Sequence, residues 1–488
     1  MRKTGVLLPV ASLPSNYGIG DFGSFAYEFI DISVEMGMKI WQILPLNPLG
    51  YGNSPYQPYS SFAGDELYIS LEKLQEKGLL KEIPAPFHKE ATSIDYSEVR
   101  AYKEPSLKEA FHNFVKDKEY EQFASMEWVK QYAVFITLKK ANGLKCWNEW
   151  KAEHQTWIID QKLDLTPFEE AIAYEKFVQY MFYCQWKELK DYANEKGIEI
   201  MGDVPFYVGI DSLDVWANQK CFLLDKSRPT YIAGVPPDYF SEVGQRWGNP
   251  IYNWEYLEET NFKFWLARIG YNKNLYDIIR IDHFRAFDTY WKIPASCETA
   301  IEGEWIEAPG YALFDALYKE MPDIEIVAED LGDMRPEVYE LRDHYHLKGM
   351  KIFQFTMDVA EENNDFEDRE NMIIYTGTHD NQTMMGWFEA QEEEYQEEII
   401  ENLEKLGYDQ EKIIDRFDSY VIDSIADWAI LPVQDILGLS DEARLNTPGT
   451  TGSPNWEWKL ENFSELRKRM IPIHQMIIES KREENENE

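Results

Sequence analysis

The sequence predicts an α/β protein in which eight parallel strands alternate with helices and close into a (β/α)8 TIM barrel. The main observation is that short apolar segments, each typical of a buried strand, recur along the chain with helical patterns between most of them. The eighth segment is less clear, because residues 426–437 also fit a partly helical pattern. The expected strands are 5–13, 39–46, 198–206, 278–284, 325–330, 349–355, 371–377 and 428–433.

Two connections are too long for simple barrel loops, and we expect both to be insertions into one barrel that spans residues 1–488. Residues 68–197 contain amphipathic patterns, for example at 109–123 and 167–196, and predict a mostly helical subdomain. Residues 207–263 are rich in glycine, proline and aromatic residues and show little periodicity. Such long segments are usually functional or disordered, and the aromatic residues argue against disorder. We interpret this segment as a lid over the mouth of the barrel.

The composition limits the class of partner. The formal net charge of −40 disfavours nucleic acid and anionic membranes but tolerates a neutral substrate. The chain holds 16 Trp, 30 Tyr and 26 Phe residues, which fit either a large core or a set of stacking surfaces for sugar rings. Nothing in the sequence favours one oligomeric state over another.

The sequence also indicates a cytoplasmic protein. No run of 18 or more apolar residues is present, so no membrane-spanning helix is expected. The apolar stretch near the N-terminus is short and contains Pro9, which favours a first strand over a signal peptide. The cysteines are far apart and predict reduced thiols without metal or redox spacing. They are Cys146, Cys184, Cys221 and Cys297.

Acidic residues follow four of the expected strands, where the active site of a TIM barrel lies. They are Asp203, Asp282, Glu329 and Asp380. Any one of them alone could be an ordinary helix N-cap. Four such strand ends in one barrel favour a shared site instead.

Two of these carboxyl groups have surroundings that suggest different protonation states. Arg280 and Asp282 are two residues apart and share a face of a strand, so the cation should keep Asp282 ionised, as a nucleophile requires. Glu329 follows an apolar run, which should raise its pKa and keep it protonated as a general acid. Asp330 faces the other way and is expected to be structural. A pair with separated pKa values is typical of glycoside cleavage.

The fourth strand end carries His379 and Asp380, which are expected to hold sugar hydroxyls and to stabilise an oxocarbenium-like transition state. A metal site is the alternative, but it would need further histidines. The chain has only eight, and His344 and His346 lie in a loop-like stretch. We therefore expect no metal.

Ordered motifs along nearly the whole chain resemble the amylomaltase family, glycoside hydrolase family 77, which is related to the α-amylases. The three that carry the acidic residues are RIDHFR at 280–285, VAEDLG at 327–332 and GTHDN at 377–381. The others are SLPS at 12–15, GIGDFG at 18–23, WQILPL at 41–46, SPYQ at 54–57, PPDYFS at 236–241, GQRWGNP at 244–250 and NW at 455–456.

The resemblance implies a role for each matching residue. Asp282 would be the nucleophile, Glu329 the acid/base and Asp380 the transition-state stabiliser, with Arg280 supporting the nucleophile. The remaining substrate-binding residues are His379 at the cleavage point, Tyr56 stacked beneath the sugar, Asp203, Gln245, Trp247 and Asn455 lining the cleft, and Asp238, Tyr239 and Phe240 on the lid. No separate C-terminal β-domain is expected.

The implied activity is that of a 4-α-glucanotransferase, which passes segments of malto-oligosaccharides to glucose or another α-glucan by a retaining double displacement without a cofactor. An α-glucan hydrolase is the nearest alternative, and hydrolytic relatives usually carry an Asn-His pair just after the aspartate of strand three. Here Asp203 is followed by Val204 and Pro205, which favours the transferase. A non-catalytic carbohydrate-binding protein would not need Arg280 beside Asp282.

Overall fold

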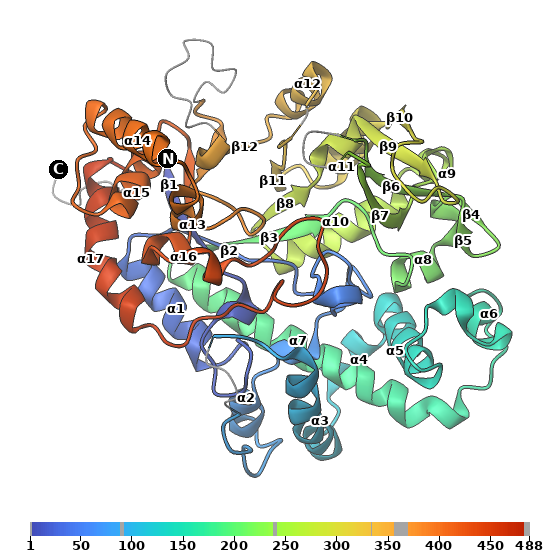
Figure 1. The fold of residues 1–488 in the computed structure, drawn as a ribbon. Helices are drawn as coiled ribbons and strands as arrows, with labels where there is room; N and C mark the ends of the chain where they lie inside the picture. The colour runs from blue at the N-terminus through green and yellow to red at the C-terminus, as the bar shows by residue number, and fades with distance from the viewer. Residues whose placement is uncertain (1, 88–91, 238–241, 333, 356–368, 483–488) are drawn as a thin grey trace.

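Eight parallel strands form a closed barrel in the computed structural model of the chain (Figure 1). The structure describes residues 2–87, 92–237, 242–332, 334–355 and 369–482. The strands pair in the order β11-β8-β3-β2-β1-β14-β13-β12. A parallel bridge between Val327 and Lys348 then joins β11 to the start of β12 and closes the ring. The TIM barrel predicted from the sequence is confirmed.

Seven of the eight expected strand segments contain one barrel strand each, and the first, 5–13, overlaps β1, which begins at Lys3. The barrel strands are β1 (Lys3–Leu7), β2 (Ile40–Gln42), β3 (Glu199–Pro205), β8 (Ile278–Asp282), β11 (Glu325–Ala328), β12 (Gly349–Ile352), β13 (Met372–Tyr375) and β14 (Trp428–Pro432). The ambiguous pattern at 426–437 belongs to two elements, because α16 (Val433–Leu437) begins directly after β14.

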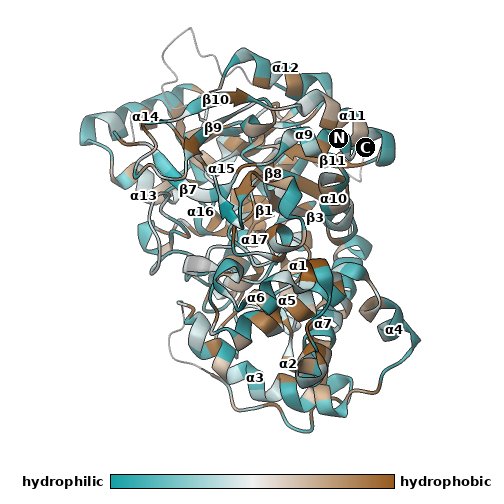
Figure 2. Ribbon diagram, turned by 90° about the vertical axis from the view of Figure 1, so that its right-hand side faces the viewer, coloured by the Kyte–Doolittle hydropathy of each residue, from teal (hydrophilic) through white to brown (hydrophobic). Residues whose placement is uncertain are grey.

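The barrel is filled by alternate strand residues and covered by helices. Every strand contributes to an interior cluster, which consists of Leu7, Ile40, Met201, Ile278, Val327, Met350, Ile352, Ile373, Tyr375, Trp428 and Ile430. The strands at the centre of Figure 2 are accordingly mostly hydrophobic, whereas outer helices such as α3 (Tyr96–Asn113) and α14 (Glu393–Lys405) are largely hydrophilic. Within the described residues, no helix has both the length and the apolar character needed to cross a bilayer.

The connection between β2 and β3 holds a group of helices at the bottom of Figure 1. The pattern at 109–123 predicts one helix, and this is wrong. The chain leaves α3 at Phe114, and Asp117 starts α4 (Lys118–Ala124) by accepting a hydrogen bond from the backbone N–H of Tyr120. The other helices are α2 (Leu71–Glu76), α5 (Glu127–Ala141), α6 (Ala152–Asp160) and α7 (Glu169–Glu195).

The last of these helices, α7, belongs to both the insertion and the barrel. Its 27 residues span about 40 Å, and it packs against α3, α4 and α5 as well as against α1 (Ser24–Glu35), α10 (Lys263–Leu275) and β3. Two glutamine side chains of α7 each bond both the N–H and the C=O of one backbone residue: Gln179 bonds Gly64, and Gln185 bonds Ser70. The helix is thereby fixed to the chain that follows β2.

The segment 207–263 is more regular than its sequence indicates. It contains α8 (Leu213–Ala217), α9 (Trp254–Glu259), a short hairpin of β4 (Leu224–Asp225) and β5 (Arg228–Pro229), and the strands β6 (Tyr231–Val235) and β7 (Gln245–Pro250). With β9 (Thr289–Pro294) and β10 (Glu304–Glu307), these last two form an antiparallel sheet in the order β10-β9-β6-β7. The expectation of an irregular segment is wrong in this respect, because half of the sheet comes from the connection after β8.

Candidate active site

The register of the barrel brings the predicted carboxylates of three adjacent strands together. Asp203 on β3 lies opposite Arg280 on β8, and Pro205 lies opposite Asp282. Glu329 follows the end of β11, and its N–H donates to the carbonyl of Ile281 at 3.1 Å, which extends the ladder to β8. The three acidic side chains therefore share the carboxyl-terminal rim of the barrel.

The Arg280 guanidinium is buried and bonds two of these carboxylates unequally. Its Nη1 lies 2.6 Å from Oδ2 of Asp203 and 3.4 Å from Oδ1 of Asp282. The same Asp203 oxygen accepts a hydrogen bond of 2.8 Å from the Tyr56 hydroxyl. The sequence suggested Asp282 as the partner of Arg280, but the shorter bond goes to Asp203.

The pKa values of Asp282 and Glu329 are raised to different extents by their surroundings. Burial raises the pKa of Asp282 to about 6, against the opposing effect of Arg280. Burial also raises the pKa of Glu329 to about 8, where the nearby charge of Asp282 adds to the rise and Arg280 opposes it. At about pH 7 the favoured state of the pair has Asp282 ionised and Glu329 protonated.

Two backbone N–H groups hold the Glu329 side chain, and one of them belongs to a residue with an unusual backbone conformation. His283 follows β8 with φ of 55°, a left-handed conformation that is uncommon for residues other than glycine. Its N–H donates to Oε2 of Glu329 at 2.7 Å, and the N–H of Leu331 donates to Oε1 at 3.3 Å.

The neighbouring Asp330 binds Arg342 at 2.5 Å and the N–H of Met350 at 2.7 Å. Its contacts are therefore structural, as its side of the strand suggested.

Three rings form a wall next to the acidic residues. The imidazole of His379, only 2% exposed, stacks on Tyr56 with ring centroids 5.2 Å apart and an angle of 13° between the planes. The Trp456 ring lies 6.0 Å from His379 and 5.8 Å from Tyr56. Burial lowers the pKa of His379, so its neutral form is favoured. Both ring nitrogens are buried, and neither has a hydrogen-bond partner in the described part of the chain.

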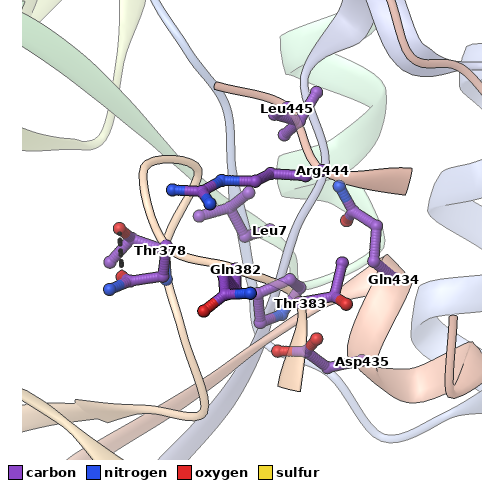
Figure 3. A pocket seen from close by; sticks show the side chains of 10 residues that line it. Leu7, Thr378, Gln382, Thr383, Gln434, Asp435, Arg444 and Leu445 are labelled. Carbon is purple, nitrogen blue, oxygen red and sulfur yellow. Dashed lines mark hydrogen bonds between the residues drawn. The ribbon is translucent and has the colours of Figure 1, made fainter. Parts of the chain in front are cut away.

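Asp380 lies beside this wall, with 44% of its side chain exposed and Oδ2 at 3.4 Å from Nε2 of His379. Its other oxygen, Oδ1, accepts a hydrogen bond of 2.7 Å from the side-chain amide of Asn446. Arg444 donates to the backbone carbonyl of Asp380 at 2.9 Å. Figure 3 shows Arg444 reaching from its own segment toward the loop that carries Thr378, above a cavity of about 10 Å³. This cavity is too small for a sugar ring and is not lined by Asp380, whose side chain is instead open to solvent.

Sequence reasoning missed Asn446, Arg444 and the backbone N–H of His283. Arg444 and Asn446 follow strand eight, and polar residues after a barrel strand are the pattern that identified the other four positions. The backbone conformation of His283, in contrast, left no sequence pattern.

The remaining predicted residues lie in different surroundings. Gln245 on β7 accepts a hydrogen bond of 3.2 Å from the Trp247 indole, whose ring centroid is 4.9 Å from that of His283. Asn455 uses its side-chain amide inside its own loop, where it bonds the N–H of Thr447 and the hydroxyl of Thr450. Its direct contact with substrate stays a prediction. Asp238, Tyr239 and Phe240 lie outside the described residues.

Metal ligation has no obvious place in this arrangement. Among the residues that the structure describes, no three or more His, Cys, Asp or Glu side chains are grouped as a metal ion would need. The site instead presents carboxyl groups, an imidazole whose neutral form is favoured, and aromatic rings.

Known proteins resemble this chain over nearly its whole length. The family model of glycoside hydrolase family 77, described as 4-alpha-glucanotransferase, matches residues 8–465. The 4-alpha-glucanotransferase of Thermus thermophilus is 41% identical over 479 residues, which cover 94% of this chain and 95% of that protein. The chloroplastic/amyloplastic 4-alpha-glucanotransferase of Solanum tuberosum is 37% identical over 499 residues, covering 95% of this chain and 83% of its own.

A solved structure agrees with these relatives. The structure of amylomaltase from Streptococcus agalactiae in complex with acarbose matches with a TM-score of 0.93 and 37% identity, covering 99% of this chain and 100% of that chain. The family model, the relatives and this structure each cover more than nine tenths of the chain. The chain therefore belongs to the 4-alpha-glucanotransferase family, glycoside hydrolase family 77, and is a transferase acting on α-1,4-glucans.

Proposed function

We propose that the protein cuts α-1,4-glucans and passes the released segment to glucose or to another α-glucan through a covalent Asp282 intermediate. The observation that carries this mechanism is the pair Asp282 and Glu329, which lie on adjacent strand ends with pKa values of about 6 and about 8. A nucleophile must be ionised while the acid is protonated, and this pair meets both requirements at about neutral pH.

The first step breaks the glycosidic bond of the donor. A carboxylate oxygen of Asp282 attacks the anomeric carbon while Glu329 gives its proton to the departing oxygen. The reducing-end fragment leaves with that proton, and the remaining sugar stays on Asp282 as an ester. The N–H groups of His283 and Leu331 keep the Glu329 carboxyl group in place during the transfer.

The second step transfers the sugar to an acceptor. Glu329, now ionised, takes the proton of an acceptor 4-hydroxyl, whose oxygen attacks the anomeric carbon and releases Asp282. Two inversions at the same carbon retain the anomeric configuration. Asp380 and His379 would hold hydroxyls of the reacting sugar, and the Tyr56 ring, stacked on His379, would form the floor below it.

Part of the aromatic segment that we propose as a lid, namely β6 and β7, belongs to the antiparallel sheet with β9 and β10. Gln245 and Trp247 on β7 reach the site through the contact of Trp247 with His283. An aromatic cover that binds acceptor sugar and excludes water would favour transfer over hydrolysis. The proposed contributions of Tyr239 and Phe240 rest on the sequence alone.

Incubation with maltotriose tests the proposed reaction. A transferase should produce glucose together with a ladder of longer oligosaccharides, because each released segment is added to another sugar. A hydrolase would give mainly glucose and maltose, and a binding protein would leave maltotriose unchanged. Chromatography of the products, with glucose release quantified, separates these outcomes.

The pH dependence of kcat/KM for maltotriose should be bell-shaped. Activity should be lost below about pH 6, where Asp282 becomes protonated, and above about pH 8, where Glu329 loses its proton. Initial rates between acid and alkaline pH, at concentrations of maltotriose well below KM, provide the measurement.

An α-glucosyl fluoride donor gives the matched control for this profile. Fluoride leaves without protonation, so the alkaline limb should disappear while the acid limb remains. An alkaline limb that is unchanged with this donor would contradict the assignment of that limb to Glu329.

We also propose that the protein works in the cytoplasm, in the metabolism of maltose and of glycogen or starch. All four cysteines are free thiols, which suits a reducing compartment. The net charge of −40 supports a neutral glucan over nucleic acid as the partner. Fractionation of the source cells, followed by the maltotriose assay, tests the location.

A further inference from the structure

The segment after β14 makes two hydrogen bonds to Asp380, and a third joins the two residues that donate them. Asn446 donates from its side-chain amide to Oδ1 of Asp380 at 2.7 Å. Arg444 donates from Nη2 to the Asp380 carbonyl at 2.9 Å and from Nε to the Asn446 carbonyl at 2.8 Å. One guanidinium thus joins the backbones of both residues, while the amide fixes the carboxylate. We call Asp380, Arg444 and Asn446 the Asp380 clamp.

We propose that Asn446 and Arg444 are positioning residues of the transfer reaction, which aim the Asp380 carboxylate at the sugar in the transition state. This inference rests on the role of Asp380 in the proposed function. Asn446 occupies Oδ1, which leaves Oδ2, beside His379, to accept hydrogen bonds from sugar hydroxyls. A carboxylate that acts by geometry needs such a supporting contact, because free rotation would weaken its bonds to the sugar.

The segment that carries Asn446 is itself braced. The Asn455 amide accepts from the N–H of Thr447 at 2.9 Å and donates to the Thr450 hydroxyl at 2.9 Å. The N–H of Trp456 donates to the carbonyl of Leu445 at 2.6 Å, which closes the loop at its base. The same loop therefore delivers Asn446 to Asp380 and the Trp456 ring to the wall of Tyr56 and His379.

The loop that carries Asp380 is fixed from the same side. The side-chain oxygen Oδ1 of Asn381 accepts from both the N–H and the hydroxyl of Thr378, at 2.9 and 2.8 Å. Asp435 on α16 accepts from the Thr376 hydroxyl at 2.5 Å and from the N–H of Met384 at 2.7 Å. Asp435 therefore holds the loop on both sides of Asp380, at Thr376 and at Met384. The Asn446 amide thus orients a carboxylate whose backbone is already fixed.

Asn446 and Asp380 differ in their exposure to solvent. Asn446 is 9% exposed, whereas the Asp380 side chain is 44% exposed. The amide therefore cannot be replaced easily by bulk water as a donor, while Asp380 stays open to the substrate. Figure 3 shows the Arg444 side chain extended toward the loop that carries Thr378. The cavity that Arg444 lines is too small to hold a sugar ring.

Asn446→Ala is the first test. We expect kcat for maltotriose to fall about ten- to a hundredfold, the range seen when an outer-shell partner of a catalytic group is removed, with KM and Tm nearly unchanged. Asn113→Ala is the matched control, because it removes one side-chain amide bond, to the carbonyl of Leu79 at 2.9 Å, in the helical insertion. The control should keep the wild-type kcat and KM.

Asn446→Asp gives a readout that a purely structural role would not change. At acid pH the introduced carboxyl group is protonated and can donate to Asp380 as the amide does. As the pH rises the introduced carboxyl group ionises, loses its donor proton and repels the Asp380 carboxylate. The alkaline limb of kcat/KM should therefore move to lower pH than in the wild type. A structural defect would instead lower the activity by the same factor at every pH.

The outcomes separate this inference from the proposed function. Wild-type kcat in Asn446→Ala would overturn the clamp, and so would an unshifted pH profile in Asn446→Asp. Both results leave the proposed function standing if the wild type disproportionates maltotriose and Asp282→Asn does not. Failure of those two conditions overturns the proposed function itself, whatever the Asn446 variants do.

Discussion

Asp282→Asn should abolish transfer from maltotriose, lowering kcat by about ten-thousandfold or more. The amide matches the carboxylate in shape and can still lie beside Arg280, which is 3.4 Å from Asp282 in the native chain. It cannot form the glycosyl ester, so the whole covalent route is lost. Initial rates at saturating maltotriose provide the measurement.

The control for this variant is Asp323→Asn, which makes the same chemical change at an exposed position near the start of β11. It should retain the wild-type kcat. Residual activity of Asp282→Asn above about one percent, with Tm unchanged, would show that Asp282 is not the nucleophile.

Glu329→Gln should trap the covalent intermediate when the donor is α-glucosyl fluoride. Fluoride leaves without an acid, so Asp282 can still form the ester. The second step lacks a base, so the ester should accumulate. Intact-protein mass spectrometry should detect one added glucosyl unit, and a peptide digest should locate it on Asp282.

Azide provides a sharper version of the same experiment. It attacks without needing a base, so it should release the trapped sugar as a glycosyl azide of the same anomeric configuration as the donor. With maltotriose as donor the variant should be nearly inactive, because that leaving group requires protonation. An adduct on Asp203 or Asp380 would instead mean that the roles of the carboxylates are exchanged.

The barrel could be predicted because its information is local. Each strand is a short apolar run, buried on both sides, and such runs are visible without knowing their partners. The same holds for Asp203, Asp282 and Glu329, which lie at or near the ends of three of those runs and meet at the rim. Two residues of one strand, Arg280 and Asp282, could also be placed on a common face.

What was missed depends on contacts between distant segments. The sheet that joins β6 and β7 to β9 and β10 could not be seen, because its short strands come from two different connections. The preference of Arg280 for Asp203 depends on the register of two strands 77 residues apart. The Asn446 bond to Asp380 likewise joins residues 66 positions apart, and sequence spacing contains no information on such pairs.

Helix α7 packs against both the helical insertion and the barrel, so the two parts cannot be treated as separate domains. Phe177, near its start, is buried against Phe111 and Phe114 of the insertion. Trp186, further along the same helix, packs on Tyr276 and donates to the carbonyl of Leu275 at the edge of the barrel. Separable domains meet at linkers that few contacts cross, and here the boundary runs through the middle of a continuous helix. Deleting the insertion, or exchanging it for that of a relative, would therefore remove the helix that covers the barrel next to β3. Engineered changes to the insertion should be confined to its loops and should leave α7 intact.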